Sequence, residues 1–145
     1  MQLTRFRCCL AFTLIEILVV LAIISALLAI AIPSYTHIIN KVKFNEVMVA
    51  AIPFKTSMEL AVEMYGAQNI NELDAGKYSI LQDVAQHPSQ YVGMISIQNG
   101  VITLQNDNMS INATYQLVAE RIANHQIIWQ DISSTQSSCV SLGWC

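Results

Sequence analysis

One acidic side chain interrupts an otherwise apolar run near the N-terminus. Phe12–Ile32 is 21 residues long, and Glu16 is its only charged residue. A charge at the centre of a bilayer costs about 2.5–3.5 kcal/mol on insertion scales, and burying it without a partner in a protein assembly is also costly. The position therefore predicts that Glu16 has a specific role. The alternative is a glutamate near the membrane surface whose side chain reaches water.

Other residue types give few signs of chemistry. The three histidines, His37, His87 and His125, are widely separated and lack metal-ligand spacing. With five glycines the chain has no phosphate-binding glycine loop, and no nucleophile–base pair stands out. The net charge is −3, and Arg121 is the only basic residue after Lys77. We therefore expect no enzyme activity, catalytic residue, metal or cofactor, and the scarcity of basic residues disfavours direct DNA binding.

The apolar run has the length of a membrane span. At about 1.5 Å per residue, Phe12–Ile32 makes a helix of about 30 Å, the thickness of a bilayer's hydrocarbon core. The eleven residues before it carry Arg5 and Arg7 and no acid, so this end is expected to stay in the cytoplasm. A secretory signal cut after Ala31 is an alternative, but Glu16 and the length of the run weigh against it.

Ala11–Tyr35 resembles the N-terminus of type IV pilins, because FTLIE is followed by an apolar run and then by IPSY. The resemblance implies that prepilin peptidase cuts the leader between Ala11 and Phe12 and that Phe12 is then N-methylated. Two positions depart from the family pattern. The family usually has glycine where this chain has Ala11, and again at the place of Ser25.

The resemblance also implies a partner for Glu16. In this family the corresponding glutamate meets the N-terminal amine of a neighbouring subunit, and the pairing favours one axial register in the filament. Leader removal would discard Arg5 and Arg7 and expose that amine. The side chains of the mature chain would then carry five basic and ten acidic groups.

The helix is predicted to continue beyond the apolar run, to Tyr65. Apolar residues recur at steps of three to five along one face, namely Tyr35, Ile39, Val42, Val47, Ala51, Phe54, Met58, Ala61 and Tyr65. Gly66 is a natural stop. Pro33 and Pro53 each remove a backbone donor and are predicted to kink this helix.

The second half of the chain predicts a loop and then strands. Residues 67–90 are polar and indicate a connection with a short helix near 79–85. Asn99–Gly100 lies between alternating apolar runs and is a strong hairpin signal. Two further strands are predicted around Asn124. We therefore expect an α+β type IV pilin fold, in which the long N-terminal helix packs on a roughly four-stranded antiparallel sheet. The expected domains are a leader (1–11), a membrane and filament-core helix (12–33) and a periplasmic globular domain (34–145).

Four cysteines fall into two pairs. Cys8 and Cys9 lie in the leader and would be discarded with it. Cys139 and Cys145 are close at the C-terminus and are expected to form a disulfide outside the cytoplasm, as the resemblance also implies. Closing so small a loop would contribute about 2–3 kcal/mol on the chain-entropy model. The family often has the first cysteine where this chain has Asp131.

These expectations combine into a structural function. The chain is predicted to be a type IV pilus subunit, anchored in the bacterial inner membrane with its C-terminal domain in the periplasm and later assembled into an extracellular filament. Its expected partners are further copies of itself, prepilin peptidase, the pilus assembly machinery and membrane lipid. The filament would support adhesion, twitching motility or DNA uptake. The alternatives are a type II secretion pseudopilin, a low-abundance competence pilin and a plain membrane-anchored binding module. The disulfide weighs mildly against the pseudopilin. Trp129 and Trp144 are candidate exposed contacts, although a tryptophan on a strand is more often part of the core.

Overall fold

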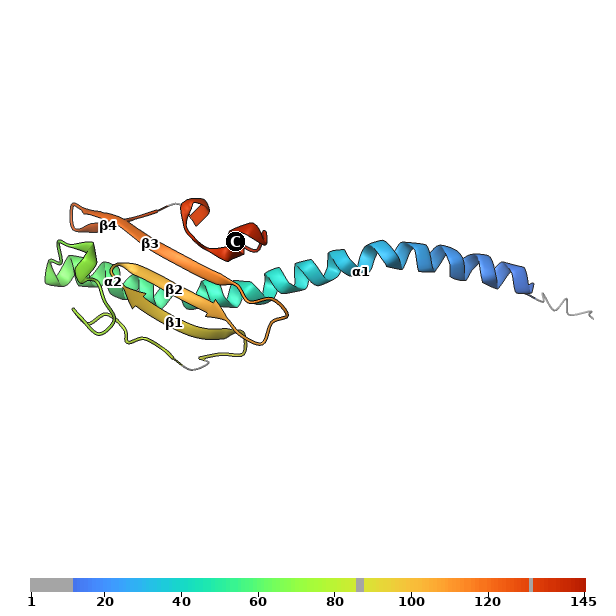
Figure 1. Cartoon of the computed structure of the whole chain (residues 1–145), viewed down its shortest axis with the longest axis horizontal. Coiled ribbons are helices and arrows are strands. Elements are labelled where there is room, and N and C mark those ends of the chain that lie inside the picture. Colours follow the sequence, from blue (N-terminus) through green and yellow to red (C-terminus); the bar gives the residue numbers. More distant parts are fainter. Residues whose placement is uncertain (1–11, 86–87, 131) are drawn as a thin grey trace, which may run out of the picture. The chain divides into compact units, whose positions relative to one another are not determined.

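The computed structural model describes residues 12–85, 88–130 and 132–145, without the side chains of Pro33 and Ser134 (Figure 1). The chain divides into two compact units, Met1–His37 and Ile38–Cys145, the second of which is called the C-terminal unit below. The predicted limits of leader, membrane segment and periplasmic domain stay predictions.

The N-terminal helix starts at a hydrogen-bonded cap. Helix α1 spans Leu14–Ala50. The Glu16 amide donates to the Thr13 hydroxyl at 3.3 Å and to the Thr13 carbonyl at 3.1 Å. Thr-Leu-Ile-Glu has the spacing of a capping box, in which the threonine oxygen satisfies an amide of the first turn. The helical backbone then continues without interruption through Pro33.

A second helix, α2 (Ile52–Tyr65), follows after one non-helical residue, Ala51. Pro53 has no N–H, so the helical hydrogen bond to the carbonyl four residues earlier is absent. Gly66 ends α2 in the left-handed conformation with φ 68°, and its amide donates to the Val62 carbonyl at 3.2 Å. The predicted end at Tyr65 is confirmed. The kinks at Pro33 and Pro53 stay predictions.

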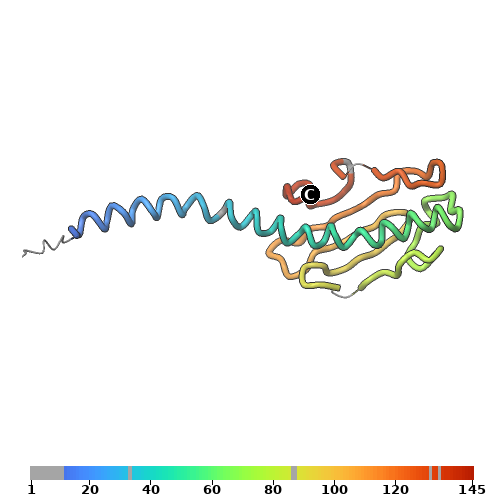
Figure 2. The backbone as a smooth tube through the Cα atoms, turned by 180° about the vertical axis from the view of Figure 1, so that it is seen from behind, coloured from blue at the N-terminus to red at the C-terminus, as the bar shows by residue number. Residues whose placement is uncertain are grey.

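Four antiparallel strands follow in the order β1-β2-β3-β4. They are β1 (Val92–Gln98), β2 (Val101–Asn106), β3 (Thr114–Ala123) and β4 (Gln126–Trp129). Within the C-terminal unit the helix runs across one face of this sheet (Figure 2). The remaining short elements are η1 (Ile70–Glu72), η2 (Ile132–Ser134) and α3 (Ser138–Ser141). The predicted α+β fold is confirmed.

A single apolar core joins the helix to the sheet. Helices α1 and α2, with Ala51 between them, contribute the buried residues Phe44, Val47, Ala51, Phe54, Met58, Ala61 and Val62. Strands β1 and β2 contribute Ile95, Ile97, Ile102 and Leu104, each at most 2% exposed. Burying such a side chain stabilises the fold by about 1.5–3 kcal/mol relative to leaving it in water.

The hairpin turns have the backbone that their sequences predict. Asn99 and Gly100 have φ of 51° and 77°, and Asn124 and His125 have φ of 52° and 59°. Positive φ at both central residues matches the twist of antiparallel strands. Gly100 is also required for space, because a Cβ there would overlap the Ile70 side chain.

The prediction of a short helix near residues 79–85 is wrong. These residues form turns and an isolated bridge, in which Val84 and Ile95 exchange hydrogen bonds of 2.9 Å. The Asp83 carboxylate also accepts from the Ile97 amide at 2.8 Å. The segment therefore satisfies its polar groups on the edge of β1 rather than within a helix.

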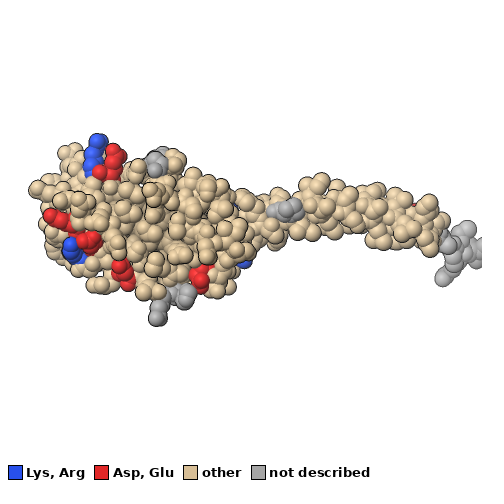
Figure 3. Space-filling view, in the orientation of Figure 1, with Lys and Arg blue, Asp and Glu red and all other residues tan. Residues whose placement is uncertain are grey.

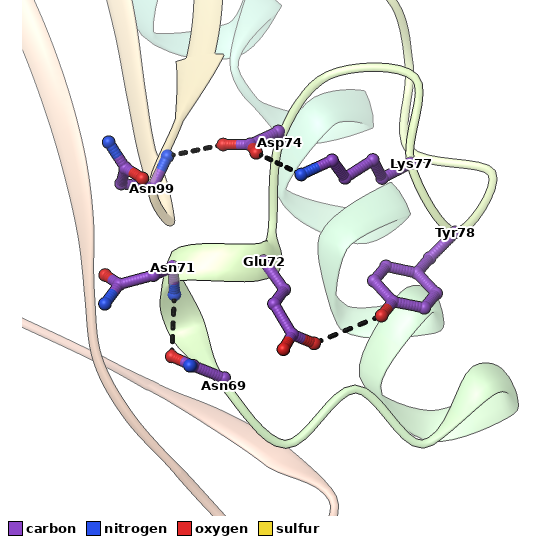
Figure 4. Close-up of polar contacts among 7 residues, drawn as sticks. All are labelled: Asn69, Asn71, Glu72, Asp74, Lys77, Tyr78 and Asn99. Atoms are coloured by element: carbon purple, nitrogen blue, oxygen red, sulfur yellow. Dashed lines mark hydrogen bonds and ion pairs between the residues drawn. The ribbon is translucent and has the colours of Figure 1, made fainter.

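Asp74 fixes the β1–β2 turn to the preceding loop (Figure 4). One carboxylate oxygen accepts from the Asn99 amide at 2.8 Å, and the other accepts from Lys77 Nζ at 2.7 Å. The Lys77 ammonium and the Asn99 N–H hold the pKa of Asp74 below its usual 3.8. The same pair raises the pKa of Lys77 above 10.5.

We expect Asp74→Asn to lower the free energy of unfolding at pH 7. Asparagine can still accept from Asn99 but cannot pair with Lys77. Because the pKa of folded Asp74 lies below 3.8, its stabilisation is present above pH 3.8 and disappears as the pH falls through the folded-state value. Urea unfolding from pH 7 to pH 2 should show the wild type and the variant converging at the acidic end. Glu46→Gln, at an exposed site on α1, is the matched control. A gap as large at pH 2 as at pH 7 would contradict the assignment.

Candidate functional site

The apolar part of α1 exposes its side chains around the whole helix. All residues from Phe12 to Ile32 are exposed, and the most apolar window has a mean hydropathy of 3.0. By length and composition this helix can cross a membrane. A helix that is apolar on all sides needs lipid or protein around it. Such a surface suits a bilayer or an assembly of helices.

Glu16 lies in the first turn of α1, and its side chain is exposed. A helix N-terminus carries a partial positive charge, so a carboxylate is favourable there. Glu16 takes part in neither the Lys55–Glu59 nor the Lys77–Asp74 ion pair. The carboxylate is thus available to a cation from outside the described chain.

The remaining N-terminal candidates are only partly described. Phe12 lies just before α1 and is 72% exposed. Ala11, on the other side of the predicted cut, lies outside the described residues, as do the charges and cysteines of the predicted leader. The Ser25 hydroxyl donates to the Leu21 carbonyl at 2.7 Å, which satisfies it within the helix. Serine therefore fits apolar surroundings at the place where the family usually has glycine.

The C-terminus forms a closed loop against the helix of the C-terminal unit. A disulfide joins Cys139, in α3, to Cys145, with Cα atoms 5.5 Å apart. Between them Trp144 packs on Phe44, with ring centroids 5.6 Å apart. Lys41 Nζ donates to the Gly143 carbonyl at 3.1 Å. The loop is thus held by a covalent bond, an aromatic contact and a hydrogen bond.

The burial of Trp144 corrects its interpretation as an exposed contact. Trp144 is 2% exposed. Trp129 is only half-buried; its indole N–H donates to Glu59 Oε1 at 2.9 Å, and Lys55 Nζ lies 5.4 Å from its ring centroid. The sequence did contain a signal for the burial of Trp144: its neighbour is Cys145, and a disulfide at that cysteine holds the segment close to the domain.

The clefts of the C-terminal unit are open and have polar linings. One of 320 Å³ lies beside Glu59, Glu63 and His125. Among the described residues, no three His, Cys, Asp or Glu side chains are placed to share a metal ion. His87, another histidine considered from the sequence, lies outside the described residues. These groups give no support to a catalytic site.

Comparison with known proteins places the N-terminal helix in a family context. Residues 6–32 match the family model described as the prokaryotic N-terminal methylation motif. Prepilin peptidase-dependent protein D of Escherichia coli (strain K12) is 32% identical over 93 residues, which cover 64% of this chain and 60% of that protein. Type IV major pilin protein PilE1 of Neisseria gonorrhoeae is 29% identical over 105 residues, covering 72% and 57%. A fimbrial protein of Neisseria meningitidis serogroup B is 28% identical over 101 residues, covering 70% and 57%.

In each case the matched region covers less than two thirds of the relative. The N-terminal motif and the helix-on-sheet fold nevertheless agree with these similarities. The chain therefore carries the prokaryotic N-terminal methylation motif of prepilins and is homologous to type IV pilins.

Proposed function

We propose that this protein is a structural subunit of a type IV pilus. Before assembly it is held in the inner membrane by the helix of residues 12–33, with residues 34–145 in the periplasm. Prepilin peptidase removes residues 1–11, Phe12 is methylated, and the inner-membrane machinery moves the subunit into a filament. The filament serves adhesion, motility or DNA uptake.

Glu16 sets the axial register between neighbouring subunits in the filament. Cleavage creates an amine at Phe12, and Glu16 of one subunit pairs with the amine of another. The pairing offsets the cost of placing a carboxylate among apolar helices. In the filament outside the membrane, contact between the apolar helix surfaces supplies most of the cohesion, because it keeps those surfaces out of water.

One observation carries the proposal: the exposed apolar segment of residues 12–32 has a single carboxylate, Glu16, in the first turn of α1, within a matched methylation motif. The test is electron microscopy and immunoblotting of sheared surface fibres from cells with and without this chain. We expect fibres that contain the chain and that disappear or change on its deletion. Fibres without the chain would contradict the proposal and favour the pseudopilin or anchored-module alternatives.

We expect the mature protein to begin at Phe12 and to carry one added N-terminal methyl group. The scissile bond lies between Ala11 and the apolar run, on the side that Arg5 and Arg7 retain in the cytoplasm. Mass spectrometry of the membrane-bound and filament forms measures both changes. In cells lacking prepilin peptidase the 145-residue chain should persist.

Ala11→Gly provides a control in the opposite direction. It restores the residue usual before the cut and should raise the rate of processing in pulse-chase labelling. A chain that keeps its leader in wild-type cells, or one that begins after Ala31, would refute the assignment.

A further inference from the structure

The sheet has an outer face that the helix does not cover. Side chains alternate between the two faces of a strand, so the residues opposite the core side chains form a separate set. The strand register aligns them in three rows across β1, β2 and β3: Met94, Gln105 and Thr114; Ser96, Thr103 and Gln116; Gln98, Val101 and Val118.

No charged residue occupies any of these nine positions, although the chain has seven basic and ten acidic residues. The side chains are amides, hydroxyls, two valines and a methionine. Figure 3 views the molecule from this side, and its charged atoms lie towards the rim of the C-terminal unit rather than over its middle. Over these three rows the outer face is therefore polar without being charged.

An open groove of 420 Å³ lies on this face. Its described lining consists of Val101, Gln116, Val118, Gln130, Thr135 and Gln136. The described lining thus combines three carboxamides and a hydroxyl with two branched apolar side chains. The volume falls within the range of about 300–1,000 Å³ that is usual for small-molecule sites.

One wall of the groove is the chain segment after β4, and hydrogen bonds hold this segment in place. The backbone N–H of Gln116 donates to the Ser137 hydroxyl at 2.9 Å, and the backbone N–H of Thr114 donates to the Ser138 hydroxyl at 2.8 Å. The backbone N–H of Gln130 donates to the Val118 carbonyl at 2.8 Å. These bonds hold the C-terminal segment along β3, so the groove exists without a ligand.

We propose that this groove binds a neutral carbohydrate. Each carboxamide offers both donors and acceptors, as does each sugar hydroxyl, and the valine methyl groups can pack on the C–H face of a pyranose ring. The described lining has no cation to hold a phosphate, sulfate or uronate, and no carboxylate to hold an amine. The site belongs to the C-terminal unit alone, so binding does not require filament assembly and can be tested separately from it.

The test uses the full chain with ¹³C-labelled valine methyl groups in lauryldimethylamine oxide micelles, since a glycoside detergent would compete. The probes are maltohexaose and cellohexaose, with anionic hexagalacturonate as a comparison. We expect saturable methyl shifts at Val101 and Val118 with a neutral hexasaccharide and none with hexagalacturonate.

Gln116→Glu places a carboxylate in the groove and keeps the backbone contacts with Ser137. It should weaken binding at least tenfold, whereas Gln90→Glu, at an exposed site outside the groove lining, should leave it unchanged. Three results would overturn the proposal: no valine shift with either neutral sugar, tighter binding of hexagalacturonate, or equal binding by the two variants. Assembly of the variants into filaments has no bearing on these outcomes.

Discussion

Glu16→Gln is expected to abolish incorporation of this subunit into filaments while leaving its level in the membrane unchanged. Glutamine keeps the length of the side chain and also serves in a capping box, so the start of α1 after Thr13 is preserved. Only the negative charge is lost. Removing one partner of a buried ion pair costs about 3–5 kcal/mol, which corresponds to a loss of about two to three and a half powers of ten in the association constant.

The experiment counts fibres per cell by electron microscopy, with the variant as the only copy of the chain, and compares immunoblots of sheared fibres and membranes. Glu46→Gln is the matched control, because it makes the same change at an exposed site of α1 in the C-terminal unit. It should assemble normally.

Glu16→Ala adds a second comparison. Alanine removes both the charge and any capping by the side chain, whereas glutamine removes the charge alone. If the alanine variant fails and the glutamine variant forms normal fibres, Glu16 acts at the helix start and the pairing with an amine is wrong. Normal fibres from both variants would remove Glu16 from assembly altogether.

Local sequence signals predicted the parts of the fold that local physics determines. Gly66 ends α2 because glycine readily adopts positive φ. Asn99–Gly100 forms the β1–β2 turn for a similar reason. The stripe through Val47, Phe54 and Met58 is the buried face of the helix. In each case neighbouring residues contain enough information to specify the conformation.

The features that were missed depend on contacts between distant segments. Val84 pairs with Ile95 of β1, and nothing within residues 79–85 indicates that a strand edge will be available there. Trp144 is buried because Phe44, a hundred positions earlier, lies beneath it. The groove likewise combines β2 and β3 with the segment after β4. A single sequence does not encode such proximity in any short pattern.

Trp144→Ala is expected to destabilise the C-terminal unit by about 3–5 kcal/mol, the usual cost of removing a fully buried large aromatic side chain. Trp144 is 2% exposed, and its loss would leave a cavity over Phe44. Urea unfolding of the full chain in detergent, followed by circular dichroism, measures the change without relying on the tryptophan signal. Trp129→Ala should cost less, because Trp129 is only half-buried.

Trp144→Phe separates packing from hydrogen bonding at the same site. The buried indole Nε1 of Trp144 has no hydrogen-bond partner among the described residues, so phenylalanine removes an unsatisfied donor while keeping a ring against Phe44. We expect it to retain most of the stability that alanine loses.

The stabilisation by the disulfide should depend on the packing of Trp144. Replacing Cys139 and Cys145 together by serine should lower the free energy of unfolding less in the Trp144→Ala background than in the wild type, because without the tryptophan the loop is no longer packed on Phe44. Strictly additive losses in this double-mutant cycle would contradict the prediction, because they would show that the disulfide and the tryptophan stabilise the domain independently.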